Sequence, residues 1–343
     1  MRVGELFAGI GGASLSIGMV IPDTETVWQA DLVNEAVRAR HFPDAAQLVG
    51  DVREVDPARL PRVDLLTAGF PCTDLSVAGR QEGLNGKNSR LYREVLRFCG
   101  ARRDDLYADD DQDNPRPWRV VFGGGYQPPR VLIENVPALL GYLPRLSADF
   151  RALGYGLTWT ACEAVDAGLP HLRRRVFVLA ELDRSGRGAV EVDQAGRWQP
   201  EGLRAWPTPC SRDYKTGDTP NRKGTEALSS AAGAAEMGRY GRRLAPAWVE
   251  ALMGYPIGWT DPDADLQPLP GAVRGRYPAG WDRSTPWPGF DWEPPRTLPD
   301  GVKAPGRAAR IRGLGNAWAP AQGALALRAL LAPAQVDLFG GGR

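Results

Sequence analysis

The sequence contains very little histidine and cysteine. Its 343 residues include two histidines, His41 and His171, and four cysteines, none of which lies in a Cys-x-x-Cys pair. Because zinc sites are usually built from such pairs or from clustered histidines, we expect no metal site. Four scattered cysteines in a chain of this length do not form a disulfide framework either. We therefore expect reduced thiols and a cytoplasmic location.

Long apolar runs and an excess of charge are also missing. No run of about 18 apolar residues occurs, and the first residues lack the apolar core of a signal peptide, so we expect neither export nor a membrane partner. The 42 basic and 41 acidic residues leave a formal net charge of +1. Such a balance neither requires nor excludes a polyanionic partner. The length predicts one large domain and one smaller domain.

Three consecutive segments with the pattern of strands each end in a turn that could contact one ligand. The first leads into a glycine turn with Gly9, Gly11 and Gly12, where backbone can approach a ligand at the start of a helix. The second ends at Asp31, whose carboxylate suits the hydroxyl groups of a ribose or, alternatively, caps the helix expected over 34–41. The third ends at Asp51. This repetition predicts a ligand that contains an adenosine.

A cysteine follows the next apolar segment, 64–69. The chain leaves this segment through Gly69, Phe70 and Pro71, which would place Cys72 at the carboxyl edge of an open sheet, where ligands bind. A lone cysteine is more often a small buried hydrophobic residue, so the interpretation of Cys72 as a nucleophile depends on its neighbours. The loop 76–90 is rich in glycine and polar residues, which is typical of a lid.

Two further stretches contain residue types with chemistry. A short strand within 129–137 would deliver Glu134 to the same edge, as a proton donor or as a structural carboxylate that caps the next helix. Alternation along a strand that follows Gly168 would place Arg173 and Arg175 on one face and Arg174 on the other. Paired guanidinium groups suit a phosphate or the carbonyl oxygen of a base.

The rest of the chain is less regular. We expect an amphipathic helix from Leu91 to Phe98, and a solvated surface insertion at the acidic run 104–113. Basic residues outnumber acidic ones in 184–243. A helix is expected over 244–254, and the proline-rich span 256–306 cannot be regular for most of its length. Tryptophans and arginines between 271 and 313 suit contact with nucleic acid or a packed surface loop. A last helix is expected over 321–332.

The order of these segments resembles the DNA (cytosine-5) methyltransferase family over nearly the whole chain. The segments that carry the resemblance are Phe7-Ala-Gly-Ile-Gly-Gly, similar to the motif that binds S-adenosylmethionine; Gly69-Phe-Pro-Cys72, similar to the catalytic loop; Glu134-Asn-Val; Arg173-Arg-Arg175; and Gly315-Asn316, similar to the closing motif. Three positions depart from the usual pattern. Thr73 and His171 stand where many members have glutamine, and Leu32 stands where many have tryptophan.

The resemblance implies an α/β fold, with a doubly wound Rossmann-like methyltransferase sheet and a smaller, irregular target-recognition domain. The implied division is a catalytic domain at 1–183, a target-recognition region at 184–310 in which helix 244–254 is a hinge or packing element, and a returning helix at 311–332. The implied catalytic residues are Cys72, Glu134, Arg173 and Arg175. Those implied for binding S-adenosylmethionine are Phe7, Ala8, Gly9, Gly11, Gly12, Asp31, Asp51, Pro71, Leu91 and Asn316.

The implied activity is that of a DNA (cytosine-5-)-methyltransferase. The thiolate of Cys72 would add to carbon 6 of a cytosine flipped out of double-stranded DNA, Glu134 would hold the proton at ring nitrogen 3, and Arg175 would bind the ring's carbonyl oxygen. The family also implies a monomer, and a cognate restriction endonuclease as a further partner.

Three alternatives stay open at this point. A nicotinamide-dependent dehydrogenase would share the early glycines and Asp31, but Ser14 replaces the last glycine of its fingerprint and it has no need of Cys72 or Glu134. A non-catalytic DNA-binding relative would not need the catalytic residues. An RNA cytosine-5 methyltransferase would keep the chemistry and change the substrate.

Overall fold

The computed structural model describes part of the chain. The described residues are 1–71, 84, 86, 89–110, 117–182, 190–191, 206–214, 228, 232, 243–269, 294–298 and 302–332. Cys72, Thr73, most of the predicted lid 76–90 and much of the predicted target-recognition region lie outside them.

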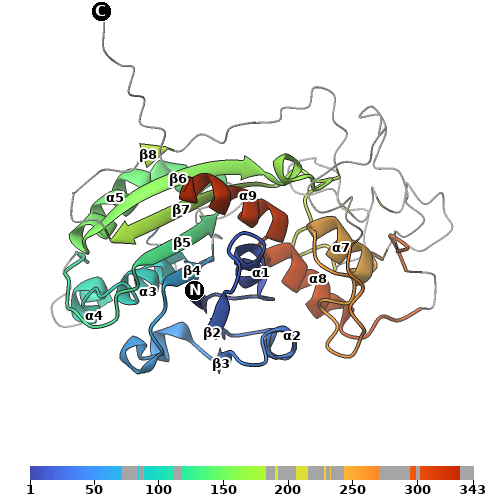
Figure 1. Ribbon diagram of the computed structural model, residues 1–343, viewed down its shortest axis with the longest axis horizontal. Coiled ribbons are helices and arrows are strands. Elements are labelled where there is room, and N and C mark those ends of the chain that lie inside the picture. The colour runs from blue at the N-terminus through green and yellow to red at the C-terminus, as the bar shows by residue number, and fades with distance from the viewer. Residues whose placement is uncertain are drawn as a thin grey trace, which may run out of the picture.

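The core of the fold is an eight-stranded sheet with the order β3-β2-β1-β4-β5-β7-β6-β8 (Figure 1). The strands are β1 (Arg2–Leu6), β2 (Glu25–Asp31), β3 (Ala46–Val49), β4 (Leu65–Ala68), β5 (Arg130–Asn135), β6 (Tyr155–Glu163), β7 (Arg174–Leu182) and β8 (Val190–Glu191). The first five pair in parallel, and β7 is antiparallel to both of its neighbours. This arrangement confirms the predicted doubly wound, Rossmann-like sheet.

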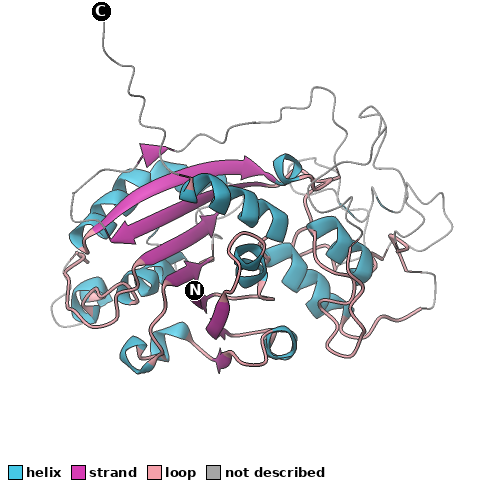
Figure 2. Ribbon diagram, in the orientation of Figure 1, coloured by secondary structure: helices cyan, strands magenta, loops and turns pink. Residues whose placement is uncertain are grey.

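Helices cover both faces of the sheet (Figure 2). They are α1 (Gly12–Gly18), α2 (Glu35–His41), α3 (Tyr92–Arg97), α4 (Arg103–Leu106), α5 (Leu143–Ala152), α7 (Pro246–Met253), α8 (Arg307–Asn316) and α9 (Pro320–Leu331). Alternation along β5 divides the core: Val131 and Ile133 pack in the cluster that contains α3 and α5, whereas Leu132 packs in the one that contains α1 and α9.

The strand order changes direction at β1, because the chain builds β2 and β3 on one side of it and β4 and β5 on the other. Ligands of open α/β sheets bind at such a switch point, outside the carboxyl ends of the strands. The antiparallel β7 begins at this same edge, since Val176 pairs with Asn135 at the end of β5. The arginine segment therefore reaches the edge from the start of a strand rather than from its end.

The helix predicted after Leu91 is present as α3, but the prediction that it is amphipathic, with one exposed face, is wrong. All six residues of α3 are buried, the charged ones included. Arg97 pairs with Glu94 at 2.6 Å, and Arg93 binds Asp109 through two hydrogen bonds of 2.6 and 2.8 Å. Because these charges are paired, the helix can lie inside the fold.

The acidic run 104–113 was expected to be a solvated insertion. Asp104, Asp109 and Asp110 are exposed, but the expectation is wrong for Asp105 and Leu106. Leu106 is fully buried in the core, and Asp105 is buried between Arg102 and Arg119. Asp110 pairs with Arg90. Surrounding arginines thus hold the described part of the run against the domain.

The C-terminal elements pack against the glycine turn and α2. Residues of α7 and α8 share a hydrophobic cluster with Ile10 and Val37. The helix predicted over 244–254 is confirmed as α7, which ends with Gly254 as its C-cap, at a φ of 82°. Helix α8 was not predicted as a separate helix: the returning helix predicted over 311–332 is divided into α8 and α9, and the expected domain boundary at 310/311 falls inside α8. The division into domains stays a prediction.

Candidate active site

A cavity of about 510 Å³ lies at the switch point of the sheet. Ten of the predicted site residues line it: Phe7, Gly9, Asp31, Asp51, Pro71, Leu91, Glu134, Arg173, Arg175 and Asn316. They come from the ends of β1 to β5, from the turn before α3, from the start of β7 and the segment before it, and from α8. The structure thus brings segments that are far apart in the sequence to one enclosed space.

Three residues predicted to bind the cofactor do not line this cavity. Ala8 is buried and donates its amide to the carbonyl of Ala30 at 3.1 Å. Gly11 has φ 82°, and the phenyl ring of Phe42 fills the space that a side chain would need. A Cβ at Gly12 would lie 2.9 Å from the carbonyl oxygen of Trp318. The contacts give both glycines a packing role, and their contact with a cofactor stays a prediction.

Asp31 is held by backbone groups at the end of β2. One carboxylate oxygen accepts from Gly9 N at 2.8 Å and the other from Val33 N at 3.0 Å. A carboxylate has about four lone-pair sites, so two remain for hydroxyl donors. The cap of α2 is Asn34, at φ 61°, rather than Asp31. The carboxylate is therefore oriented at the cavity and has acceptor capacity to spare.

Asp51 lies at the next strand end and forms a tight local pair. Its carboxylate accepts from the amide of Arg53 at 2.9 Å and from its Nε at 3.0 Å. These hydrogen bonds lower the pKa of Asp51. Arg53 also lines the cavity, and the sequence interpretation did not include it.

Glu134 and Arg175 face each other across the cavity edge. Oε1 of Glu134 lies 3.0 Å from Nε of Arg175, and it accepts no hydrogen bond from the residues that the structure describes. Gly69 is required beside them, because a Cβ there would lie 2.7 Å from Nε1 of Trp318 and 3.7 Å from Oε2 of Glu134. The pair is thus partly enclosed and retains acceptor capacity.

Asn135 connects this pair to the chain that leads to Cys72. Its Nδ2 donates to the carbonyl of Phe70 at 3.1 Å, and its Oδ1 accepts from Val136 N at 2.9 Å. Because Phe70 and Pro71 directly precede Cys72, this amide fixes the point from which the predicted nucleophilic loop departs. The sequence analysis included Asn135 only as part of the Glu134-Asn-Val motif.

Arg173 is buried behind the cavity wall and connects it to α8. Its Nη2 donates to the carbonyl of Ala317 at 2.6 Å, and its own carbonyl accepts from Gln322 of α9 at 2.6 Å. His171 is fully buried near it. Burial and the charges of Arg173 and Arg175 lower the pKa of His171 to about 3. The imidazole is consequently neutral at ordinary pH.

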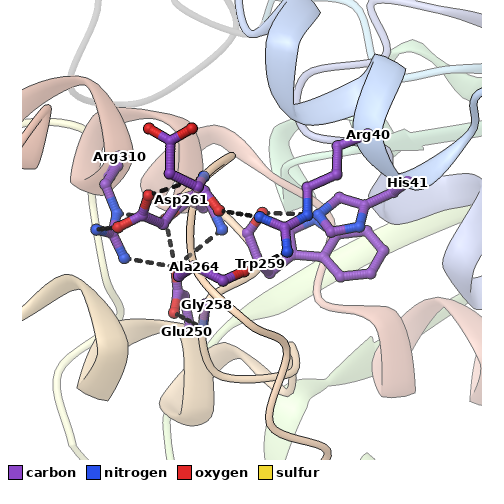
Figure 3. A network of polar contacts seen from close by, with 10 residues as sticks. Arg40, His41, Glu250, Gly258, Trp259, Asp261, Ala264 and Arg310 are labelled. Carbon is purple, nitrogen blue, oxygen red and sulfur yellow. Dashed lines mark hydrogen bonds and ion pairs between the residues drawn. The ribbon is translucent and has the colours of Figure 1, made fainter.

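A buried polar network holds α8, which supplies one cavity wall (Figure 3). Glu250 of α7 accepts from the amides of Gly258 and Thr260, at 2.7 and 2.9 Å, and from Arg310 of α8 at 3.1 Å. Arg310 also bonds Asp261 at 2.7 Å. The loop after α7 thereby fastens α8 in place.

The same loop contacts the glycine turn and α2 (Figure 3). The ring of His41 stacks on Trp259 at a centroid distance of 3.6 Å, and Trp259 Nε1 donates to the carbonyl of Ile10 at 2.9 Å. Arg40 donates to the carbonyls of Asp261 and Ala264. The glycine turn, α2 and α8 are thus joined through one loop.

Fifteen further residues line the cavity that were not named as site residues, although five of them (Gly69, Phe70, Asn135, Val136 and Gly315) belong to the motifs quoted above. The fifteen are Ala30, Leu32, Val33, Asn34, Gly50, Val52, Arg53, Gly69, Phe70, Asn135, Val136, Ala309, Arg312, Gly313 and Gly315. Many of them are direct neighbours of predicted residues in the sequence, so they could have been predicted by adjacency. Ala309 and Arg312 could not, because their position depends on α8.

The described residues contain neither a membrane-spanning helix nor a cluster of metal-ligating side chains. None of the helices in these ranges is long and apolar enough to span a membrane. The same part of the chain has no cluster of three or more histidine, cysteine, aspartate or glutamate residues that could hold a metal ion.

Known proteins resemble this chain in sequence and in fold. A relative from Bacillus subtilis, "Type II methyltransferase M2.BsuMI", is 33% identical over 187 residues, which are 53% of this chain and 42% of that protein. "Type II methyltransferase M.NlaX" of Neisseria lactamica is 27% identical over 188 residues, 53% of this chain and 52% of that protein. The chain thus spans about half the length of the curated relatives it matches.

Among solved structures, the S. pombe Dnmt2 methyltransferase superposes with a TM-score of 0.54 at 15% identity, covering 96% of this chain and 98% of that one. That likeness shows the fold alone. The model of one family, C-5 cytosine-specific DNA methylase, matches residues 1–108 and 118–202. More than half of the sequence is covered by this match, and the chain belongs to the C-5 cytosine-specific DNA methylase family.

Proposed function

We propose that this protein transfers a methyl group from S-adenosylmethionine to carbon 5 of a flipped-out cytosine in a specific DNA sequence. One observation supports this most directly. Glu134, Arg173 and Arg175, which suit a pyrimidine ring, line the same cavity as Asp31 and the other groups that suit an adenosine. A methyl donor and an acceptor base need such a shared space.

The cavity fits a nucleoside cofactor in size and chemistry. Its volume of about 510 Å³ falls within the usual range for small-molecule sites. Asp31 would accept the ribose hydroxyls, and Phe7, Asp51, Pro71, Leu91 and Asn316 would enclose the remainder. S-adenosylmethionine, when bound there, supplies a methyl group activated by its sulfonium.

Cys72 would act as the nucleophile. Its thiolate adds to carbon 6 of the cytosine, and the ring electrons then make carbon 5 nucleophilic enough to take the methyl group. Loss of the proton from carbon 5 and breakage of the bond between sulfur and carbon 6 restore the ring and free the enzyme. An ordinary cysteine pKa of about 8.5 leaves only a few per cent of thiolate at neutral pH, so a polarising neighbour is needed.

Glu134 and Arg175 would bind one edge of the ring. Their side chains lie 3.0 Å apart, a spacing that suits two adjacent ring atoms. Glu134 would hold the proton at nitrogen 3, which neutralises the charge that develops there, while Arg175 donates to the neighbouring carbonyl oxygen. The ion pair orients both groups before the base enters.

We further propose double-stranded DNA as the substrate, a monomeric enzyme in the cytoplasm, and a target-recognition role for 184–310. Resemblance to proteins named type II methyltransferases supports DNA as the substrate and a restriction endonuclease as a second partner. A base inside a duplex cannot reach a cavity of this kind, so it must be flipped out at a cost of a few kcal/mol.

Bisulfite sequencing of DNA from a methylation-free bacterial host tests the proposal. Hosts would express the wild type, Cys72→Ala, or Cys99→Ala as a control in a core cysteine remote from the cavity. We expect protected cytosines at one short recurring sequence with the wild type and the control, and none with Cys72→Ala. No protection with the wild type would refute DNA methylation and favour an RNA substrate or an inactive DNA-binding relative.

Glu134→Gln should slow methyl transfer by about 10²–10⁴, the usual contribution of a general acid. Single-turnover transfer from labelled S-adenosylmethionine to DNA that contains the site identified by sequencing would measure it. A rate near that of the wild type would remove Glu134 from the mechanism.

A further inference from the structure

An arginine is completely buried beneath the cavity. Arg38 lies on α2 and has 0% exposure. Its Nη1 donates to the carbonyl of Gly9 at 3.0 Å and to that of Val33, and its Nε donates to Oε1 of Gln47 at 3.0 Å. No carboxylate among the described residues forms an ion pair with it at contact distance. Arg38 therefore donates its hydrogen bonds to backbone carbonyl oxygens and to a side-chain amide oxygen.

Gly9 and Val33 are the same two residues that hold Asp31. Their amides donate to the two carboxylate oxygens of Asp31, at 2.8 and 3.0 Å, and their carbonyls accept from the single Nη1 of Arg38. Both residues also line the cavity. The turn after β1 and the turn after β2 are thus joined twice, once through the carboxylate at the cavity and once through the guanidinium below it.

A chain of buried amides fixes the direction of the arginine. Gln47 Nε2 donates to Gln29 Oε1 at 3.0 Å, so the Oε1 of Gln47 is left to face Arg38. Gln29 in turn donates to Glu5, which also accepts from the amide of Ser14 at 2.9 Å. The chain crosses β1, β2 and β3 to the first turn of α1, and each link restricts the rotamer of the next.

Burying this guanidinium is costly, and hydrophobic packing does not explain it. Burial lowers the pKa of Arg38, while the charges of Asp31, Glu5 and Glu35 oppose that effect. An apolar residue of similar length would fill the space without the cost of desolvation. What it would lose is the pair of bonds to Gly9 and Val33.

We propose that Arg38 is a positioning residue, which holds the carboxylate of Asp31 in the orientation that receives both ribose hydroxyls of the cofactor. The inference rests on the proposed function, since it takes S-adenosylmethionine as the ligand. Arg38 does not touch the ligand. It acts through Gly9 and Val33, because holding their carbonyls restricts the backbone turns that also carry their amides.

Calorimetric binding of two probes tests this: S-adenosylhomocysteine, and its analogue that lacks both ribose hydroxyls. In the wild type the analogue should bind more weakly, because Asp31 loses its partners. Arg38→Met should weaken S-adenosylhomocysteine about tenfold, the loss expected for one well-oriented hydrogen bond to a charged group, and leave the analogue within about twofold. Arg38→Lys, which keeps the charge, should lie between Arg38→Met and the wild type.

Arg93→Met is the matched control. Arg93 is 1% exposed and also donates to a backbone carbonyl, that of Leu106, but it pairs with Asp109 and does not line the cavity. This variant should lower the unfolding temperature and leave the affinity for both probes unchanged. The comparison thereby separates the general effect of removing a buried arginine from the specific effect of removing Arg38.

The outcomes are distinct. An equal loss of affinity for both probes in Arg38→Met would overturn the inference, because it would show general damage to the cavity. The same equal loss in Arg38→Lys decides the matter where the methionine variant does not fold. Failure of the wild type to bind S-adenosylhomocysteine at all would refute the proposed function instead.

Discussion

His171 should make the folded protein sensitive to mild acid. Its side chain is fully buried, and burial together with Arg173 and Arg175 lowers its pKa from an ordinary 6.5 to about 3. The unfolded chain therefore binds a proton at this residue at a higher pH than the folded protein does. Consequently the free energy of unfolding falls as the pH drops below about 6.5, and goes on falling until about pH 3.

The size of the effect follows from the two pKa values. Near pH 5 the histidine of the unfolded chain is almost fully protonated and that of the folded protein almost fully neutral, so the free energy of unfolding changes by about 1.4 kcal/mol per pH unit. Between pH 6.5 and pH 5 the accumulated loss is about 1.6 kcal/mol. Glutamine at this position would not titrate.

Urea unfolding of the wild type and of His171→Gln at pH 6.5 and pH 5.0 would measure it. The wild type should lose about 1.6 kcal/mol more than the variant between the two conditions, with similar m values. Carboxylates and His41 titrate in both proteins, so their contributions cancel in the comparison. Equal losses in the two proteins would show that His171 is not buried in its neutral form, and would refute the placement of this residue beside the arginines.

Two further predictions concern the packing of α8. Glu250→Gln should lower the free energy of unfolding by about 3 kcal/mol, because Arg310 loses a buried charged partner; Glu25→Gln, in an exposed pair with Arg2, should change it by less than about 1 kcal/mol. Equal urea midpoints for these two variants would contradict the network. Gly315→Ala should lower the free energy of unfolding by about 2 kcal/mol or more, because its Cβ would lie 2.6 Å from the carbonyl oxygen of Cys210. Gly18→Ala is the control: its Cβ would lie 3.8 Å from the hydroxyl of Thr24, so it should change the free energy of unfolding by less than about 1 kcal/mol. Similar unfolding curves for both glycine variants would show that α8 does not lie against 210–211.

The strands that reach the cavity, and their ends, could be predicted from local pattern, whereas β6 and β8 were not predicted. Segment 25–31 is rich in β-branched and aromatic residues and ends in an acid, and β2 has these bounds. The residues at strand ends, such as Asp31, Asp51 and Glu134, were found for the same reason. In a parallel sheet the strand ends share one edge, so a reading of each segment alone was enough to bring these side chains together.

Helix α8 could not be predicted in this way. Its sequence contains Gly313 and Gly315, which disfavour a helix. Both positions are explained by tertiary contacts: a Cβ at Gly313 would lie 3.1 Å from Ile10, and one at Gly315 would meet the backbone at 210–211. The cavity wall formed by Ala309 and Arg312 was missed as a consequence.

Charged residues in helices were the other source of error, because a charge in sequence usually indicates a solvated face. Four arginines are buried in the described part of the chain: Arg38, Arg93, Arg97 and Arg173. Arg93 and Arg97 pair with Asp109 and Glu94, and the first of these partners lies in the run that was expected to be solvated. A partner 16 residues away cannot be identified from the helix alone.

Arg93 and Arg97 each bind a backbone carbonyl in addition to their carboxylates, whereas the hydrogen bonds of Arg38 and Arg173 reach two cavity turns and the end of α8, which gives these two arginines another role. Arg38 holds Gly9 and Val33, and Arg173 holds Ala317, the residue after Asn316. All of these carbonyls belong to turns at the cavity wall or directly next to it. A buried arginine that is paired with a carboxylate contributes mainly to stability. Its removal should therefore be detected as a lower free energy of unfolding. A buried arginine that binds the carbonyls of a ligand-binding turn also restricts where the amides of that turn point. Its removal should therefore be detected first as a lower affinity for the ligand. The comparison of Arg38→Met with Arg93→Met tests this division directly, because the two side chains are equally buried and differ in what they hold.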